Sequence, residues 1–160
     1  MDDRKPDMIE PDAGLMLRPA QLGDAAALAI LATQLGYPST TEQAVTRLQH
    51  LLSSPLHLVL VAEWSGEVAG WVHVERRVNL ESGEGAELMG LVVHERHRRL
   101  KLGSQLVRAA ERWASGEGLG SLTVRSNIVR DASHALYRSL GYAAVKTQHV
   151  YRKGLDAHRA

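Results

Sequence analysis

The chain has 160 residues, of which 44% are hydrophobic and 23% charged, as is typical of one soluble globular domain. Nineteen Lys and Arg against 18 Asp and Glu leave a formal net charge of +1, which argues against a strongly basic nucleic-acid-binding protein. The sequence contains no cysteine, so disulfides, Cys-bound zinc, iron–sulfur clusters and thiol nucleophiles are excluded.

The first residues carry no secretory signal, because charges of both signs are not followed by an apolar segment. We expect residues 1–13, which contain two prolines, to form a flexible tail, and residues 14–160 to form one domain. No apolar run approaches the length of a membrane span. A cytoplasmic protein without a membrane partner is therefore the default expectation.

The first elements are a short strand and two helices. Leu15–Arg18 predicts a strand that stops at a proline, and an Ala- and Leu-rich helix follows Asp24 and ends near Leu35. Ser39–Gln43 contains two overlapping capping boxes, which predict the start of a second helix running to about Ser53.

Three strands follow in the middle of the chain. His57–Glu63 and Val68–Arg77 are joined by the turn Ser65–Glu67, so they predict a hairpin. A looser turn at Asn79–Gly85 leads into Ala86–Val93, which is apolar over most of its length, as expected for a central strand covered on both faces.

The last part of the chain alternates helices and strands. An amphipathic helix is predicted from about Gly103 to Ser115, because its leucines, alanine and tryptophan form one apolar stripe. Leu122–Arg125 alternates as a strand does, and a short helix starts at Asp131 or Ser133 and ends at Leu140, before a glycine suited to the left-handed C′ position. Two short strands are expected to close the domain, at Tyr142–Val145 and Thr147–Arg152.

This order, β-α-α-β-β-β-α-β-α-β-β, predicts a fold of the α/β (α+β) class. The strand–helix–strand stretch from Ala86 to Asn127 implies a right-handed crossover between parallel strands. The hairpins require antiparallel pairs elsewhere, so the sheet should be mixed and mostly antiparallel.

The segment with most chemical information joins the apolar strand to the Gly103 helix. Backbone N–H groups in such a loop and in the first helical turn have no intrahelical partner, and the helix dipole adds partial positive charge. A diphosphate is the natural ligand of such a site. Gly103 allows close approach of the backbone, Ser104 offers a hydroxyl, and three side chains add positive charge: Arg98, Arg99 and Lys101.

The stretch Arg98-Arg99-Leu100-Lys101-Leu102-Gly103 resembles the Gln/Arg-x-x-Gly-x-Gly/Ala loop of the GNAT superfamily of acyl-CoA-dependent N-acyltransferases. Residues 15–152 share the family's order of elements, and Ala135–Tyr142 resembles its second motif. There are two departures. Lys101 stands where the first motif glycine is usual, so its φ must be negative or strained. Arg130 stands where many members have asparagine, and Asn127 is the nearby substitute.

The resemblance implies an acetyl-CoA-dependent N-acetyltransferase fold with splayed fourth and fifth strands and no metal. The pantetheine arm of coenzyme A would lie in that gap, and one N–H of Val92 or Val93 would face the thioester oxygen. The implied cofactor-binding residues are Leu91, Val92, Val93, Arg98, Arg99, Leu100, Lys101, Leu102, Gly103, Ser104 and Asn127.

Transfer to an amine needs a base for the ammonium and an acid for the departing thiolate. The resemblance assigns these catalytic roles to Glu87 and Tyr137, respectively. Partial burial should raise the pKa of Glu87, and His73 and Glu75 are the reserve bases. The alternatives without a catalytic role are that Glu87 is a solvated carboxylate at a strand end and that Tyr137 is a core aromatic residue.

The pattern His94-Glu95-Arg96-His97 is one residue short of His-Glu-x-x-His and lies in a loop, so both histidines are expected to be solvated and not metal ligands. The resemblance places the acceptor, a small-molecule or peptide amine, between Leu35–Pro38 and Lys146–His149. The long hairpin strands leave room for a homodimer. Two other functions stay open: a non-catalytic CoA-binding module, and nucleic-acid binding through the basic loop, against which the near-zero net charge and the absence of phenylalanine count.

Overall fold

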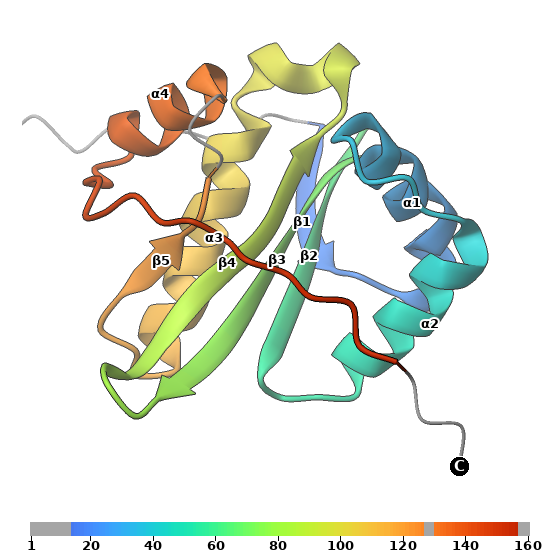
Figure 1. Ribbon diagram of the computed structural model, residues 1–160. Helices are drawn as coiled ribbons and strands as arrows, with labels where there is room; N and C mark the ends of the chain where they lie inside the picture. Colours follow the sequence, from blue (N-terminus) through green and yellow to red (C-terminus); the bar gives the residue numbers. More distant parts are fainter. Residues whose placement is uncertain (1–13, 127–129, 157–160) are drawn as a thin grey trace, which may run out of the picture. The chain divides into compact units, whose positions relative to one another are not determined.

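The computed structural model describes residues 14–126 and 130–156, and the chain divides after Asn127 into two compact units. The first unit holds every strand of the described chain and three of its α-helices (Figure 1). Its elements in chain order are β1 (Leu15–Pro19), η1 (Leu22–Asp24), α1 (Ala25–Gln34), α2 (Thr41–Leu52), β2 (His57–Trp64), β3 (Glu67–Asn79), β4 (Gly83–Val93), η2 (Glu95–Leu100), α3 (Leu102–Gly116) and β5 (Leu122–Val124).

The five strands form one sheet in the order of the sequence. The pairs β1–β2, β2–β3 and β3–β4 are antiparallel, and β4–β5 is parallel. The parallel pair is the one joined through α3, as a crossover helix requires. The expected fold class, a mixed and mostly antiparallel sheet with helices, is therefore confirmed.

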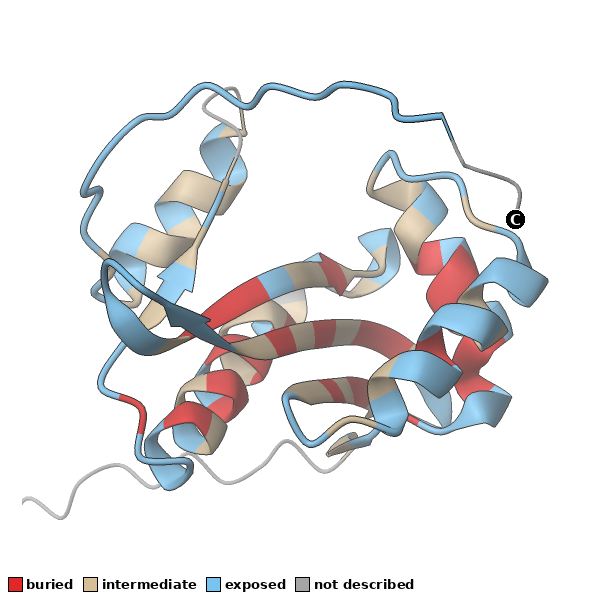
Figure 2. Ribbon diagram, turned by 60° about the horizontal axis from the view of Figure 1, so that its bottom comes forward, coloured by how far each residue is buried: buried red, intermediate tan, exposed pale blue. Residues whose placement is uncertain are grey.

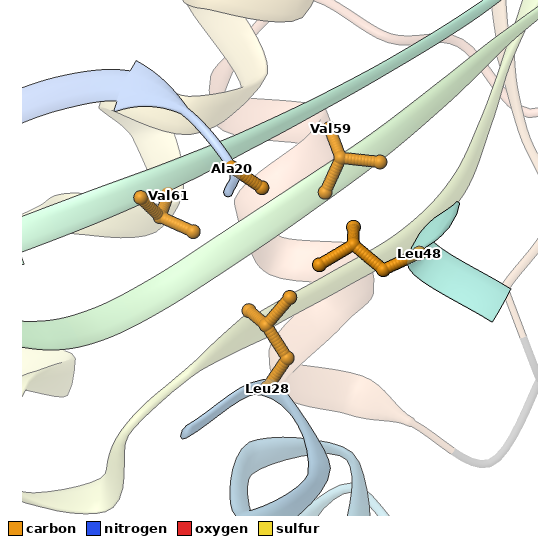
Figure 3. Packing of buried hydrophobic residues seen from close by; sticks show 5 residues of the cluster. All are labelled: Ala20, Leu28, Leu48, Val59 and Val61. Carbon is orange, nitrogen blue, oxygen red and sulfur yellow. The ribbon is translucent and has the colours of Figure 1, made fainter. Parts of the chain in front are cut away.

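One face of the sheet packs against α1 and α2. Val59 and Val61 of β2 meet Leu28 of α1, Leu48 of α2 and Ala20 after β1 in a cluster of buried side chains (Figure 3). The short helices can contribute to this core because each presents apolar residues three or four positions apart toward the sheet.

The opposite face packs against α3. Leu102, Leu106 and Val107 of this helix are fully buried, and Figure 2 shows the buried residues gathered on the strands and on the side of α3 that meets them. Gly70 on β3 faces this helix: a Cβ there would lie 3.3 Å from Leu106 Cδ1 of α3 and 2.8 Å from the Val92 carbonyl oxygen of β4. The glycine thus lets strand and helix pack without a gap.

The start of α2 agrees with the capping signal of the sequence. Thr40 caps α2: its Oγ1 accepts from the Gln43 N–H at 3.1 Å, and Gln43 Oε1 accepts from the Thr40 N–H at 3.1 Å. Both bonds satisfy N–H groups that the helix leaves unpaired, as in the predicted capping box.

The second unit contains α4 (Asp131–Ser139) and the segment after it. Gly141 takes the positive φ expected just beyond this helix. The final strands expected at Tyr142–Val145 and Thr147–Arg152 are absent, because residues 142–156 form no helix or strand and are mostly exposed. Alternating hydropathy permits an extended chain, but a strand needs a ladder partner, and a two-stranded hairpin alone is marginal in water.

Two of the sequence predictions concern residues that the structure does not describe. These are the tail expected at residues 1–13 and the cofactor contact expected at Asn127. No helix in the described chain is long and apolar enough to cross a membrane.

Candidate active site

The edge of β4 opens beyond its third pair with β5. Ala86, Glu87 and Leu88 pair with β5, whereas the described chain offers Met89–Val93 no partner on that side. The β3–β4 register also shifts at this point: Leu88 pairs with Val74 and Gly90 with His73, so Met89 is an extra, bulged residue. Leu91, Val92 and Val93 therefore lie on a strand that is paired on one edge only, as the expected splay requires.

The basic loop after β4 is a turn of three-ten helix followed by α3. Lys101, between the two, has φ 57° and ψ 25°. Of the two conformations expected for a lysine in place of the motif glycine, it therefore adopts the strained, left-handed one. The α3 ladder starts where Gln105 N–H donates to the Lys101 carbonyl at 3.2 Å. The N–H groups of the first turn have no partner within the helix, which makes this end a suitable anion site.

The loop is anchored by one buried leucine, and its charged side chains are exposed. Leu102 is fully buried, whereas Arg98 and Lys101 are exposed and Gly103 and Ser104 half-buried. The positive side chains can therefore reach an anion while the helix start stays fixed to the sheet. The side chain of Arg99 lies outside the described residues.

His94 has a structural role that the sequence analysis missed. Its Nδ1 accepts from the Arg96 N–H at 3.1 Å and so caps the three-ten turn. Its Nε2 lies 3.3 Å from Gln34 Nε2 at the end of α1. His94 was expected to be solvated, but it is half-buried, caps its own loop and lies against Gln34 of α1.

Glu87 is held by two arginines. Its Oε2 accepts from Arg77 Nη1 on β3, and its Oε1 accepts from Arg125 Nε, just after β5, at 2.6 Å. The residue is only 6% exposed. Burial acts to raise its pKa, but the hydrogen bonds and charges of both guanidiniums outweigh it, so the pKa of Glu87 is lowered. The expected rise is therefore wrong.

The two reserve bases lie on the same face as Glu87. His73 pairs in register with Gly90 and Glu75 with Glu87, and cross-strand partners point to the same side of a sheet. His73 is also the register partner of Val59, whose side chain faces α1 and α2. All three candidate bases thus share the face opposite α3.

His73 forms a pair with His57 of β2. Nδ1 of His57 lies 2.9 Å from Nε2 of His73, with the rings tilted by 39°. Burial, together with the neighbouring His57, lowers the pKa of His73 to about 4. His73 is therefore neutral at physiological pH and joined by a hydrogen bond to a second imidazole.

Tyr137 belongs to α4 in the second unit and packs edge-on against Tyr142, with ring centroids 5.8 Å apart. Burial raises its pKa against the opposing effect of the Arg130 charge. Its phenol therefore stays protonated at neutral pH, as a proton donor must.

The residues that sequence reasoning missed are the partners of the candidate bases: Arg77, Arg125 and His57. The alternation within β3 places Arg77 on the face of His73 and Glu75, which was a usable signal. No residue pattern predicted the β4–β5 register that brings Arg125 to Glu87. In the described chain no group of three or more His, Asp or Glu residues is placed to hold a metal ion.

Comparison with known proteins gives a family and a set of relatives. A family model described as the acetyltransferase (GNAT) family matches residues 25–142. Aminoglycoside N(6')-acetyltransferase type 1 of Klebsiella aerogenes is 26% identical over 151 residues, covering 90% of this chain and 99% of the relative. Acetyl transferase GW6a of Oryza sativa subsp. japonica is 31% identical over 131 residues, covering 74% of this chain but 31% of the relative.

Solved structures agree with the fold. Aminoglycoside N-acetyltransferase AAC(6')-Iy, solved in complex with CoA, superposes with a TM-score of 0.80 at 18% identity, covering 91% of this chain and 99% of that one. At this identity the likeness concerns the arrangement of helices and strands.

Proposed function

Because this chain belongs to the acetyltransferase (GNAT) family, an acetyl-CoA-dependent group of acyltransferases, we propose that it acetylates a primary amine by direct attack in a ternary complex. The observation that carries the proposal is the edge of β4, which loses its β5 partner after Leu88 and leads straight into the anion-binding start of α3. A thioester on a long amide-containing arm with a diphosphate at its end fits these two features in order.

The cofactor would be held by backbone groups first. The edge of Leu91–Val93 that has no strand partner in the described chain offers N–H and C=O groups to the pantetheine amides, and one N–H of Val92 or Val93 is suited to bind the thioester oxygen. The segment Arg98–Ser104 supplies the diphosphate site through its N–H groups and the charges of Arg98 and Lys101. Arg99, Leu100 and Leu102 complete the loop, and Asn127 remains a predicted contact.

Acetyl transfer forms a C–N bond and breaks a C–S bond, and two protons move. We assign the base that takes the proton of the ammonium to His73, because it lies beside Gly90 at the bulge, is uncharged at neutral pH and is hydrogen-bonded to His57. Glu75 stays the alternative. Glu87, the base expected from the sequence, is a poor candidate because both carboxylate oxygens are bound by guanidiniums.

The departing sulfur takes up a proton, for which we keep Tyr137 as donor. Its raised pKa preserves the O–H at neutral pH. The chain has no cysteine, so an acetyl-cysteine enzyme intermediate is impossible and the amine must attack the thioester directly.

For the acceptor we propose a small-molecule primary amine. Support comes from the name of the bacterial relative, which covers nearly the same length, so an aminoglycoside with a 6'-amine is the first candidate. The described carboxylates at the sheet face, Glu75 and Glu87, are close to guanidiniums. A polycation would therefore find little uncompensated negative charge there, so amines with a single positive charge belong in the same test.

The deciding experiment incubates the protein with acetyl-CoA and a panel of amines. The panel contains 6'-amino aminoglycosides, monoamines, lysine peptides and peptide N-termini, and the readouts are free thiol and product mass. We expect acetylation of a small amine and slower thiol release in Tyr137→Phe. Binding of acetyl-CoA without turnover across the panel would favour a non-catalytic module. Wild-type activity in Tyr137→Phe would return the tyrosine to a packing role.

A further inference from the structure

Glu87 joins three neighbouring strands through its side chain. Arg77 reaches it from β3 and Arg125 from the end of β5, and each binds a different carboxylate oxygen. We infer that Glu87 is a positioning residue, whose bond to Arg125 fastens β5 to β4 at the point where the cofactor gap opens. The inference rests on the proposed function for the role of that gap.

The β4–β5 pair depends on this contact because the ladder between the two strands is short. β5 has three residues and pairs with β4 at three positions, in the parallel arrangement that is slightly less stable per residue. Glu87 pairs with Thr123 and Leu88 with Val124, so Arg125 is the first residue beyond the last rung. Its hydrogen bond to Glu87 therefore supports the last two pairs of the β4–β5 ladder.

The charges around Glu87 favour a fixed ion pair over proton transfer. Its side chain is 8% exposed, whereas those of Arg77 and Arg125 are 43% and 61% exposed, so the carboxylate is the buried partner of both bonds. Glu75 faces it from the register position on β3 and lies 3.9 Å from Arg77, so its charge is also balanced there. A proton taken up by Glu87 would weaken two charge-assisted bonds at once.

The arginines allow a matched control. Arg125→Gln removes the bond between β4 and β5, whereas Arg77→Gln removes the bond to β3 and leaves the β4–β5 bond in place. Because β3 and β4 also share a long antiparallel ladder, the loss of Arg77 should matter less for the gap. We expect the KM for acetyl-CoA to rise roughly tenfold in Glu87→Gln and Arg125→Gln, and about twofold in Arg77→Gln.

A double variant isolates the contact from other effects, since Arg125 makes a further interaction besides the one to Glu87. If the two residues act as a unit, Glu87→Gln/Arg125→Gln should raise KM little more than either single change. Arg125→Lys keeps the charge and one donor, so it should recover part of the loss.

The experiment combines steady-state kinetics over pH with hydrogen exchange of the free enzyme. We expect faster exchange of the Thr123 amide, which the parallel register turns toward β4, in Glu87→Gln and Arg125→Gln but not in Arg77→Gln, with the pH profile of kcat unchanged. Loss of the ascending limb of that profile in Glu87→Gln, with KM unchanged, would make Glu87 the base and overturn the inference. Equal exchange in all variants, or a fall in Tm with unchanged KM, would overturn it too.

The exchange measurement needs neither turnover nor cofactor, so it separates this inference from the proposed function. Wild-type protein that fails to bind acetyl-CoA would refute the function and the cofactor role of the gap. The role of Glu87 in holding β5 would still be decided by the exchange of the Thr123 amide.

Discussion

The indole of Trp71 covers Gly90 across the β3–β4 pair, so that a Cβ at Gly90 would lie 2.7 Å from Trp71 Cζ3 and 2.8 Å from Cη2. This contact adjoins the bulge at Met89, where the edge of β4 opens. The Trp71 Nε1 is buried and has no hydrogen-bond partner in the described structure, so the ring is held there by packing.

We expect Gly90→Ala to destabilise the fold by about 1–3 kcal/mol, because the ring must move to admit the methyl group. Trp71→Phe should relieve the clash, so Gly90→Ala/Trp71→Phe should be more stable than the sum of the single effects. Urea unfolding of the four proteins measures this. If the losses in the free energy of unfolding are additive, the Trp71 ring does not determine which side chains fit at position 90.

Gly70→Ala makes a contrasting case. Its methyl group would lie 2.8 Å from the carbonyl oxygen of Val92, which is backbone. A smaller side chain nearby cannot relieve that contact, so we expect a larger loss than for Gly90→Ala and no rescue by Leu106→Ala. Thermal unfolding of both glycine variants would check the order.

Lys101 carries a left-handed backbone that glycine adopts without strain. Lys101→Gly should therefore raise the free energy of unfolding by up to about 1 kcal/mol, whereas Lys101→Ala keeps the strain and should not. Both variants lose the ammonium, so weaker binding of CoA in both would assign the charge a role at the diphosphate. Calorimetric titration with CoA, paired with urea unfolding, separates backbone from charge.

Arg18 ties the first strand to its neighbours. Both Nη atoms bind Asp24 at 2.8 Å, and Nε binds Glu63 of β2 at 2.9 Å. These bonds to Arg18, with the Gln21 N–H, lower the pKa of Asp24 against the effect of burial. Stability from this group is thus present above its unfolded pKa and is lost as pH falls through the folded value.

Asp24→Asn should therefore cost roughly 3 kcal/mol at pH 7 and make stability less dependent on pH below about 4. Glu63→Gln is the matched control and should cost less, since its carboxylate is more exposed and shares only Nε. Urea midpoints between pH 2 and 7 measure both. An unchanged acid slope in Asp24→Asn would remove Asp24 from the acid response.

His73 predicts a second pH response at milder acidity. Its pKa is about 4 in the folded protein, below the ordinary value of 6.5, so the unfolded chain binds the proton more readily. Stability should fall as pH drops from about 6.5 toward 4, and His73→Gln should flatten this part of the curve. His50→Gln, which changes an exposed histidine on α2 and leaves the His57–His73 pair intact, is the matched control.

The local part of the fold was predictable from sequence. The Thr40 capping box and the Gly141 helix end were visible as residue patterns because they depend on neighbours within four positions. The strands His57–Trp64 and Glu67–Asn79 were visible for the same reason, since a short turn joins them. The closing strands were not, because their existence depends on a ladder partner and not on local pattern.

The candidate site divides in the same way. The loop from Arg98 to Ser104 was predicted from local residues, and its role in binding the diphosphate of coenzyme A stays a prediction. The environment of Glu87 could not be predicted, because Arg77 lies ten residues before it and Arg125 thirty-eight after it. Burial was foreseen, but the two guanidiniums that reverse the sign of the pKa shift were brought there by the strand register.

The one-sided pairing of Met89–Val93 also bears on how the protein behaves without its cofactor. A row of unpaired backbone donors and acceptors attracts other extended chains, and natural sheets usually shield such rows. If coenzyme A fills this row, it acts as a shield as well as a reactant. Preparations saturated with CoA should then resist precipitation during concentration and storage better than ligand-free ones.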